Sequence, residues 1–454
     1  MFGRRTSHFI AMFSTIFLIC ALQAQENWPQ WRGPALNGIS SSKDLPTTWS
    51  NTENIVWKTP LPSWSAGTPA IWGDRIFVTS PSKTENTQPA PPPEPEDEGR
   101  RRRGGDGRDP GGQKLLLLCL SKRDGTILWQ QQLDEGNELF RKQNNSSPSP
   151  VTDGKHVWVV TGNGTVVALT PEGRKVWQKN LQEEYGEFGL GWGYGSSPLL
   201  YDGKLIIEVL HGRRTDDPSY LVAFEGATGK VIWRVERPTD AVDESPDAYT
   251  TPTLFQYNGQ MQIVVSGGDY VTGHDPDTGR ELWRTAGLNP QKDRNYRIIA
   301  SPITTENMIY APTRKKPLLA LRAEDGGEVP EISLAWKWEG PAGTDVPTPI
   351  CDGKYFYMVD DRGLVVCLKA GSGEVVWGPE RTAQGNVSAS PLLADGKIYI
   401  TNEQAVTTVL AAGDKFEVKA TNELDGSYTL ASPAVSGSQL FVRTESHLYC
   451  IGKP

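Results

Sequence analysis

The sequence predicts an all-β protein, a single eight-bladed β-propeller with four-stranded antiparallel blades. Three observations predict this fold: a phrase that occurs eight times, a slot for a small residue in the third strand, and a tryptophan about ten residues after that slot in most copies. One copy is stretched, and the seventh lacks the tryptophan and has Phe416 nearby. The chain of 454 residues holds 47 Gly, 34 Pro and 15 Trp, an excess of turn-forming residues over average usage. With 37% hydrophobic residues, it can bury a large core, and one all-β domain can be this long.

The repeated phrase consists of a small residue, a proline, an apolar pair, a turn and an apolar strand. Successive copies lie 42 to 54 residues apart after a first interval of 79 residues. Eight copies of about four strands each are typical of a propeller. The prolines that mark the copies are Pro69, Pro148, Pro198, Pro252, Pro302, Pro349, Pro391 and Pro433.

Each copy predicts four strands in order. The proline opens the innermost strand, where a missing N–H is tolerated, and an Asp-Gly pair such as 202–203 supplies the positive φ of a two-residue hairpin. A β-branched run such as 157–160 then forms the second strand. The third strand carries the small slot, which is Ala168 in one copy and Cys367 in another. Because a slot that accepts Ala or Cys indicates a buried position, these cysteines are expected to be free core thiols.

The tryptophans of the outermost strands are predicted to pack between neighbouring blades rather than to bind a ligand. The segments 223–233, AFEGATGKVIW, and 273–283, GHDPDTGRELW, show the pattern most clearly. In this pattern the tight turn needs Gly, and a large flat ring fills the wedge between two blades. The predicted packing set is Trp57, Trp129, Trp177, Trp233, Trp283, Trp336 (or Trp338) and Trp377.

Both ends of the chain are predicted to close the ring. The eighth copy stops at Ile451, before any outermost strand, and residues 54–58 have the composition of that missing strand. Closure of this kind removes a pair of exposed sheet edges. The propeller is therefore assigned to residues 54–454, and residues 25–53 are assigned to an N-terminal segment packed on it.

Two segments lie outside this predicted ring. Residues 1–24 combine two arginines, an apolar stretch and a cleavage motif that ends at Ala24, which indicates a signal peptide and an exported protein, periplasmic or extracellular. Residues 81–112 are rich in Pro and Gly and hold an acidic cluster beside Arg100–Arg103, a composition typical of a disordered insert in the first blade. No other stretch is apolar and long enough to form a transmembrane span in the mature chain.

The pattern A-x-D-x-x-T-G-x-x-x-W, repeated around a ring of eight, resembles the tryptophan-docking motif of quinoprotein (PQQ-type) β-propellers. The segment 28–34, WPQWRGP, is also similar to the start of many exported bacterial PQQ-like repeat proteins. That group includes PQQ-dependent alcohol dehydrogenases and the non-enzymatic outer-membrane assembly factor BamB. The resemblance spans about residues 28–454 and implies the fold, whereas function depends on sites grafted on a fold.

The resemblance implies functions of two classes. Dehydrogenases of this group hold PQQ with Ca²⁺ through carboxylate and amide oxygens and use an Asp base, and many place adjacent cysteines over the cofactor. This chain has no Cys-Cys pair and no C-x-x-C-H haem motif, and its five histidines lack metal-ligand spacing. The leading hypothesis is therefore a non-catalytic binding or scaffold protein, a monomer whose partner is an envelope protein or polymer. The alternative is a PQQ- and Ca²⁺-dependent dehydrogenase whose small-molecule substrate is an alcohol or sugar.

A ligand site is expected at the mouth of the central channel, where loops enter the innermost strands. The loop 185–195 places Trp192 and Tyr194 among glycines, and another entering loop holds Arg294 and Arg297. These four side chains are the candidate contact residues, with plugging of the channel as the alternative role for the two aromatic rings.

Basic residues gather in the same loops, where they would attract an anionic ligand or partner, although acidic residues share these loops. A third and weaker hypothesis is a polyanion-binding protein that uses this mouth together with Arg100–Arg103. The net charge of −8 argues against nucleic acid as that polyanion. The basic residues of the mouth are Arg141, Lys142, Arg213, Arg214, Arg294, Arg297, Arg314, Lys315 and Lys316.

Overall fold

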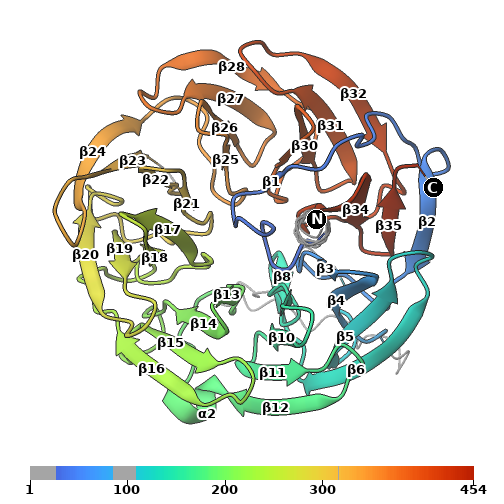
Figure 1. Ribbon diagram of the computed structural model, residues 1–454, viewed down its shortest axis with the longest axis horizontal. Helices are drawn as coiled ribbons and strands as arrows, with labels where there is room; N and C mark the ends of the chain where they lie inside the picture. Colours follow the sequence, from blue (N-terminus) through green and yellow to red (C-terminus); the bar gives the residue numbers. More distant parts are fainter. Residues whose placement is uncertain (1–26, 85–108, 315, 454) are drawn as a thin grey trace, which may run out of the picture.

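The computed structural model describes residues 27–84, 109–314 and 316–453, and these residues form eight radial sheets around a central channel (Figure 1). Seven sheets have four strands each, and the eighth gains a short fifth strand from the N-terminal segment. The four strands of each blade are antiparallel neighbours, in chain order except for the outermost strand of the last blade, which confirms the predicted eight-bladed propeller.

The blades follow one another around the ring. Blade 1 consists of β3 (Ala70–Trp72), β4 (Arg75–Pro81), β5 (Lys114–Ser121) and β6 (Ile127–Glu135); blade 2 of β9 (Val151–Thr152), β10 (Val157–Val160), β11 (Thr165–Leu169) and β12 (Lys175–Asn180); blade 3 of β13 (Leu199–Tyr201), β14 (Lys204–Val209), β15 (Tyr220–Glu225) and β16 (Val231–Glu236); and blade 4 of β17 (Thr253–Tyr257), β18 (Gln260–Gly267), β19 (Tyr270–His274) and β20 (Glu281–Ala286). Blade 5 consists of β21 (Ile303–Thr304), β22 (Met308–Ala311), β23 (Leu318–Glu324) and β24 (Glu331–Trp338); blade 6 of β25 (Ile350–Cys351), β26 (Tyr355–Val359), β27 (Leu364–Lys369) and β28 (Val375–Arg381); and blade 7 of β29 (Leu392–Ala394), β30 (Lys397–Thr401), β31 (Val406–Ala411) and β32 (Val418–Glu423).

The last blade joins the two ends of the chain, as predicted. It consists of β33 (Ala434–Ser436), β34 (Gln439–Arg443), β35 (His447–Ile451) and, on the outside, β2 (Ile55–Pro60) from the N-terminal part of the chain. Figure 1 shows β2 and β35 side by side at the edge of the ring. Trp57 lies opposite Cys450 in this pair, the same register that places Ala223 opposite Trp233 in blade 3.

Most of the predicted tryptophans dock onto the turn of the next blade. Trp177 of blade 2 donates its Nε1–H to the carbonyl oxygen of Gly226 in blade 3 at 2.7 Å. A Cβ atom at Gly229, where φ is +72°, would lie 2.6 Å from the same ring, so this turn requires glycine on two counts. Equivalent bonds run from Trp57, Trp129, Trp233, Trp336 and Trp377 to the carbonyl oxygens of Lys122, Pro171, Pro276, Ala370 and Gly413.

Trp283 departs from this pattern. Its Nε1–H donates to Gln262 Oε1 within the same blade at 2.7 Å, and its ring covers Gly273, where a Cβ atom would overlap it. In the next blade, blade 5, more residues separate the small slot of the third strand from its partner on the outermost strand than in the blades that receive the other rings. Trp283 is therefore a core residue, 8% exposed, but it does not dock on blade 5.

The predicted slot cysteines are buried and free. Cys119, Cys367 and Cys450 each lie opposite the tryptophan of their blade, and Cys351 is buried in blade 6. Burial raises the pKa of the Cys119 thiol to about 12, which makes it unreactive near neutral pH.

The N-terminal segment forms a plug across the channel, where its trace crosses the ring in Figure 1. Trp28 exchanges backbone hydrogen bonds with Ile71 of blade 1, and Gln30 Oε1 accepts one from the backbone N–H of Leu200 in blade 3 at 3.1 Å. Further along, β1 (Ile39–Ser40) pairs in parallel with β29 of blade 7. The plug, defined as residues 28–40, thus contacts innermost strands on several sides of the ring.

A buried arginine fixes the plug to two blades. Arg32 is 2% exposed and donates to the carbonyl oxygens of Pro349 and Pro391, each at 2.7 Å, and to that of Asn37 at 3.0 Å. Burial lowers the pKa of this guanidinium to about 9. The arginine of the WPQWRGP segment is therefore a structural anchor whose charge is met by backbone carbonyls.

The predicted insert is shorter at both ends than the sequence indicated. Pro81 belongs to β4, and the backbone N–H groups of Ser82 and Gly112 donate to the carbonyl oxygens of Lys114 and Ser82, at 2.8 and 2.7 Å. These bonds extend the β4–β5 hairpin beyond the predicted boundary. Residues 85–108, Arg100–Arg103 among them, and the predicted signal peptide at 1–24 lie outside the described residues. Across the described ranges, no helix has the length and apolar character needed to cross a bilayer.

Candidate binding pocket in the central channel

A pocket of about 250 Å³ lies in the channel, on the face where the loops enter the innermost strands. The five entering loops, residues 140–145, 185–195, 244–249, 293–297 and 343–346, each contribute a lining residue, and the plug contributes Trp31. The five loop residues are Phe140, Trp192, Tyr249, Arg297 and Val346. The sequence therefore located the mouth correctly, because the position of the marker proline fixes which end of each innermost strand faces it.

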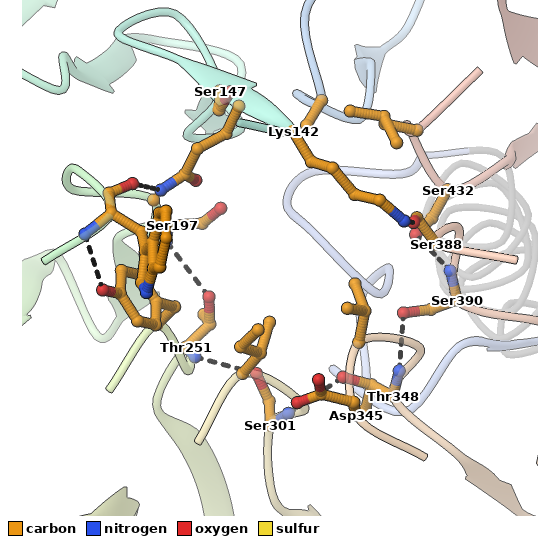
Figure 2. A pocket seen from close by; sticks show the side chains of 18 of the residues that line it. Lys142, Ser147, Ser197, Thr251, Ser301, Asp345, Thr348, Ser388, Ser390 and Ser432 are labelled. Carbon is orange, nitrogen blue, oxygen red and sulfur yellow. Dashed lines mark hydrogen bonds between the residues drawn. The ribbon is translucent and has the colours of Figure 1, made fainter. Parts of the chain in front are cut away.

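A ring of serine and threonine hydroxyls surrounds this pocket (Figure 2). Each hydroxyl belongs to the residue before the proline that opens an innermost strand, and its oxygen accepts a hydrogen bond from the preceding blade. The backbone N–H of Ser197, for example, donates to Thr251 Oγ1 at 3.0 Å, and that of Thr251 donates to Ser301 Oγ at 2.8 Å. The residues of this hydroxyl belt are Ser149, Ser197, Thr251, Ser301, Thr348, Ser390 and Ser432.

The belt corrects one marker of the repeat. In blade 2 the hydroxyl comes from Ser149, so Pro150 rather than Pro148 opens the innermost strand. The sequence Ser-Pro-Ser-Pro at 147–150 offered both registers. The sequence contains a small residue before every marker proline, and this pattern could have predicted the belt. Only the start of each innermost strand was inferred from it.

Two ion pairs cross the wall of the pocket. Lys142 comes from the hairpin of β7 (Leu139–Phe140) and β8 (Gln143–Asn144), and its Nζ lies 2.6 Å from Glu403 Oε1, on the far side of the ring. Glu403 also accepts the Ser388 hydroxyl proton at 2.6 Å. Arg297, 12% exposed in its side chain, lies 3.4 Å from Asp345 Oδ2. Two of the three cations that line the pocket are thus paired locally, and the third, Arg141, is exposed.

The four candidate contact residues separate into two groups. Trp192 and Arg297 line the pocket, as predicted. Tyr194 is 2% exposed and donates its hydroxyl proton to the backbone carbonyl of β14 at 3.0 Å, so it is a core residue and not a contact residue. Arg294 is exposed at the rim, where it pairs with Asp243, and it does not line the pocket.

A buried acid organises part of the basic mouth. Glu244, 5% exposed, lies within 3.1 Å of Arg213, 3.9 Å of Arg297 and 4.0 Å of Arg314, and it accepts the Trp192 Nε1–H at 2.7 Å. Lys315 lies outside the described residues. One carboxylate thus holds three of the predicted basic side chains together, and it offsets one of their three positive charges.

Other carboxyls of the mouth hold the loops through backbone hydrogen bonds. Asp247 accepts from the N–H of Gly191 at 2.6 Å, and Asp361 accepts from the N–H of Val346 at 3.0 Å. Burial raises the pKa of both carboxyls to about 6 despite these bonds. Burial also raises the pKa of Asp345, against the opposing effect of Arg297.

The described residues form no cluster of the usual charged or sulfur metal ligands. In those parts of the chain, no group of three or more His, Cys, Asp or Glu side chains is close enough together to hold a metal ion. None of the described cysteines lines the pocket, and Asp345, which lies beside the belt in Figure 2, is engaged by an arginine.

The ring of eight blades, six of which dock a tryptophan on the next blade, and its plugged channel define a PQQ-like β-propeller. The family described as outer membrane protein assembly factor BamB matches residues 113–379 and, in a second alignment, 218–453. The chain belongs to this family.

Relatives within and beyond the family agree on the fold. The outer membrane protein assembly factor BamB of Salmonella typhimurium (strain LT2) is 23% identical over 361 residues, which cover 70% of this chain and 86% of that protein. The crystal structure of BamB from Moraxella catarrhalis has a TM-score of 0.55 at 14% identity and covers 87% of this chain and 97% of its own. A europium-containing methanol dehydrogenase has a TM-score of 0.64 at 13% identity, with 95% of this chain and 92% of its own covered. At these identities, the structural likeness shows the fold alone.

Proposed function

We propose that this protein is a non-catalytic binding platform of the cell envelope, which holds a protein partner on the loops around the pocket mouth. The observation that carries the proposal is the state of the charged groups that hold the mouth loops: Glu403, Glu244 and Asp247 are each bound to a cation or to backbone N–H groups. Side chains tied in this way stiffen the loops, as a preorganised binding surface requires.

Membership of the BamB family supports the same class of function. The relatives are named outer membrane protein assembly factors, and the predicted signal peptide would deliver this chain to the same side of the inner membrane. The proposed partner is therefore an envelope protein, and the proposed location is the periplasm or the cell surface.

The mouth is the face that we assign to the partner. It carries the irregular loops, among them the hairpin of β7 and β8 and the loop after α2 (Leu181–Tyr185), and binding residues concentrate on loops held by a rigid scaffold. Arg141 and Arg294 are exposed there. The opposite face carries the tight hairpins at the far ends of the innermost strands.

Site-specific photocrosslinking in the native envelope tests this assignment. A photoreactive amino acid is placed at Arg141 or Arg294 on the mouth and, as matched controls, at Trp72 or Asn258, which lie in innermost-strand hairpins on the opposite face. We expect both mouth positions to yield an adduct with the same envelope protein, identified by mass spectrometry, and the control positions to yield none. Adducts from the control positions alone, or no adduct from either mouth position, would contradict the proposal.

The alternative is a PQQ- and Ca²⁺-dependent dehydrogenase, which is supported by likeness of fold to the methanol dehydrogenase. It predicts cofactor binding and turnover of an alcohol or sugar. A test with PQQ, Ca²⁺ and an artificial electron acceptor distinguishes it from the platform.

A further inference from the structure

The hydroxyl belt presents a ring of unused hydrogen-bond donors to the pocket. Each belt hydroxyl uses its oxygen to accept a backbone N–H, and among the described residues none of the seven hydroxyl protons has a recorded acceptor. All seven side chains line the pocket and are at most 7% exposed. A hydroxyl oxygen has two lone pairs, so each group also keeps one acceptor position.

A hydrogen-bond acceptor without a partner also lies beside the belt. Asp345 Oδ1 is buried and has no hydrogen-bond partner within the described ranges, and Figure 2 shows this side chain beside Ser301 and Thr348. Because a buried unpaired carboxylate oxygen is costly, the pocket is short of a donor at this point. A ligand that donates here and also bonds to the belt would satisfy both.

Aromatic rings complete the lining. Trp31, brought in by the plug, and Trp192, from the glycine-rich loop, are both half-buried and line the pocket. Trp192 is fixed by its Nε1–H bond to Glu244 and by a backbone bond to the Tyr249 hydroxyl at 3.0 Å. These rings offer flat apolar surfaces in a cavity whose lining combines the belt hydroxyls with apolar side chains such as Phe140, Ile299 and Leu430.

The charge of the wall around the belt favours a neutral ligand over an anion. Lys142 and Arg297 are already paired with Glu403 and Asp345, and the free oxygen of Asp345 would repel an anion placed against the belt. The third cation of the lining, Arg141, is exposed to solvent. The volume of about 250 Å³ lies below the roughly 300 Å³ at which pockets for drug-sized ligands begin. The occupant is therefore small.

We infer that the central pocket binds one ring of a neutral saccharide, whose hydroxyls bond to the belt and to Asp345 while its C–H face packs on Trp31 or Trp192. A sugar hydroxyl both donates and accepts, which matches a lining that presents both kinds of group. This site goes beyond the proposed platform role, which concerns a protein on the outer loops, and either conclusion stands if the other fails.

Calorimetric titration of the full protein with D-glucose, D-galactose and N-acetyl-D-glucosamine tests the inference, with D-glucuronate as the anionic counterpart. We expect saturable binding of at least one neutral sugar at millimolar or lower concentration, and weaker binding of glucuronate. Tryptophan fluorescence should change over the same range, because two indole rings line the pocket. Binding by none of the three neutral sugars, or tighter binding of glucuronate than of all three, overturns the inference.

Variants then locate the site. The double variant Thr251→Val and Thr348→Val removes two belt hydroxyls and keeps side-chain shape, and the loss of two hydrogen bonds predicts binding weaker by roughly tenfold or more. Thr304→Val is the matched control, because Thr304 bonds to the carbonyl of Leu254 outside the pocket and should leave binding unchanged. Melting curves establish that each variant is folded. A second variant, Asp345→Asn, leaves the belt intact and should also weaken binding of the sugar. Equal affinity in both pocket variants and the control overturns the inference.

Discussion

A buried carboxyl beneath the mouth makes the stability of the ring depend on pH. Glu208 lies in β14 and is 1% exposed. Its Oε1 accepts the Thr250 hydroxyl proton at 2.8 Å, whereas its Oε2 has no partner among the described residues. Burial raises the pKa of this carboxyl from 4.5 to about 8, against the opposing effects of Thr250 and Arg237.

The sign and size of the effect follow from this shift. A carboxyl whose pKa is higher in the folded state than in the unfolded chain contributes stability below the unfolded pKa, and that contribution is lost as the pH rises through the folded pKa. Linkage with these two pKa values predicts that ionisation of Glu208 costs about 4 kcal/mol of unfolding free energy between about pH 5 and about pH 8.5.

Glu208→Gln isolates this contribution, because the amide keeps the acceptor for Thr250 and cannot ionise. Urea denaturation of both proteins should give similar unfolding free energies near pH 5, and the variant should be the more stable by a few kcal/mol near pH 8.5. Asp247 and Asp361, whose pKa values are also raised, affect both proteins alike and cancel in the difference. Parallel stability curves for the two proteins would refute the reasoning.

Three further predictions concern the ring and its plug. Gly229→Ala should lower the unfolding free energy by about 1–3 kcal/mol more than Gly203→Ala. Both glycines have φ near +70°, but only Gly229 lies against the Trp177 ring. Equal losses of unfolding free energy in urea denaturation would contradict the docking of Trp177 on this turn. Arg32→Ala removes three charge-assisted hydrogen bonds, each worth about 1.5–3 kcal/mol, although it also removes the cost of burying the guanidinium charge. Limited proteolysis should then cut within residues 27–53 while the ring still melts cooperatively. An unchanged digestion pattern would show that Arg32 does not anchor the plug. The four described cysteines should react with a thiol reagent only after unfolding, so rapid labelling of the native protein would show that they are not buried thiols.

The repeat predicted the ring because each blade makes the same local demands. A proline, a tight hairpin, a small slot and a tryptophan recur within about 50 residues in most copies, so the strands, their order and the closure by β2 followed from the chain alone. The exception is Trp283, which bonds to Gln262 of its own blade. The stretched spacing of blade 5 was visible in the sequence, whereas the replacement partner, Gln262, was not.

The pocket was harder to predict because its contacts join distant parts of the chain. Lys142 and Glu403 are 261 residues apart in sequence, and Glu244 gathers arginines from three different loops. Sequence reasoning placed these loops at one mouth but had no means of pairing their charges. Tyr194 was placed with Trp192 because the two share a loop, yet the backbone directs only one of the two rings into the pocket.

Cofactor addition tests the central claim, that the propeller is a binding platform without a quinone. The purified protein is melted with PQQ and Ca²⁺ together, with each alone and with neither, and assayed for reduction of an artificial electron acceptor with alcohols and sugars. A ligand that binds the folded state stabilises it in proportion to its saturation. The account predicts no rise in Tm and no turnover, whereas a rise in Tm that needs both PQQ and Ca²⁺, accompanied by acceptor reduction, would contradict it.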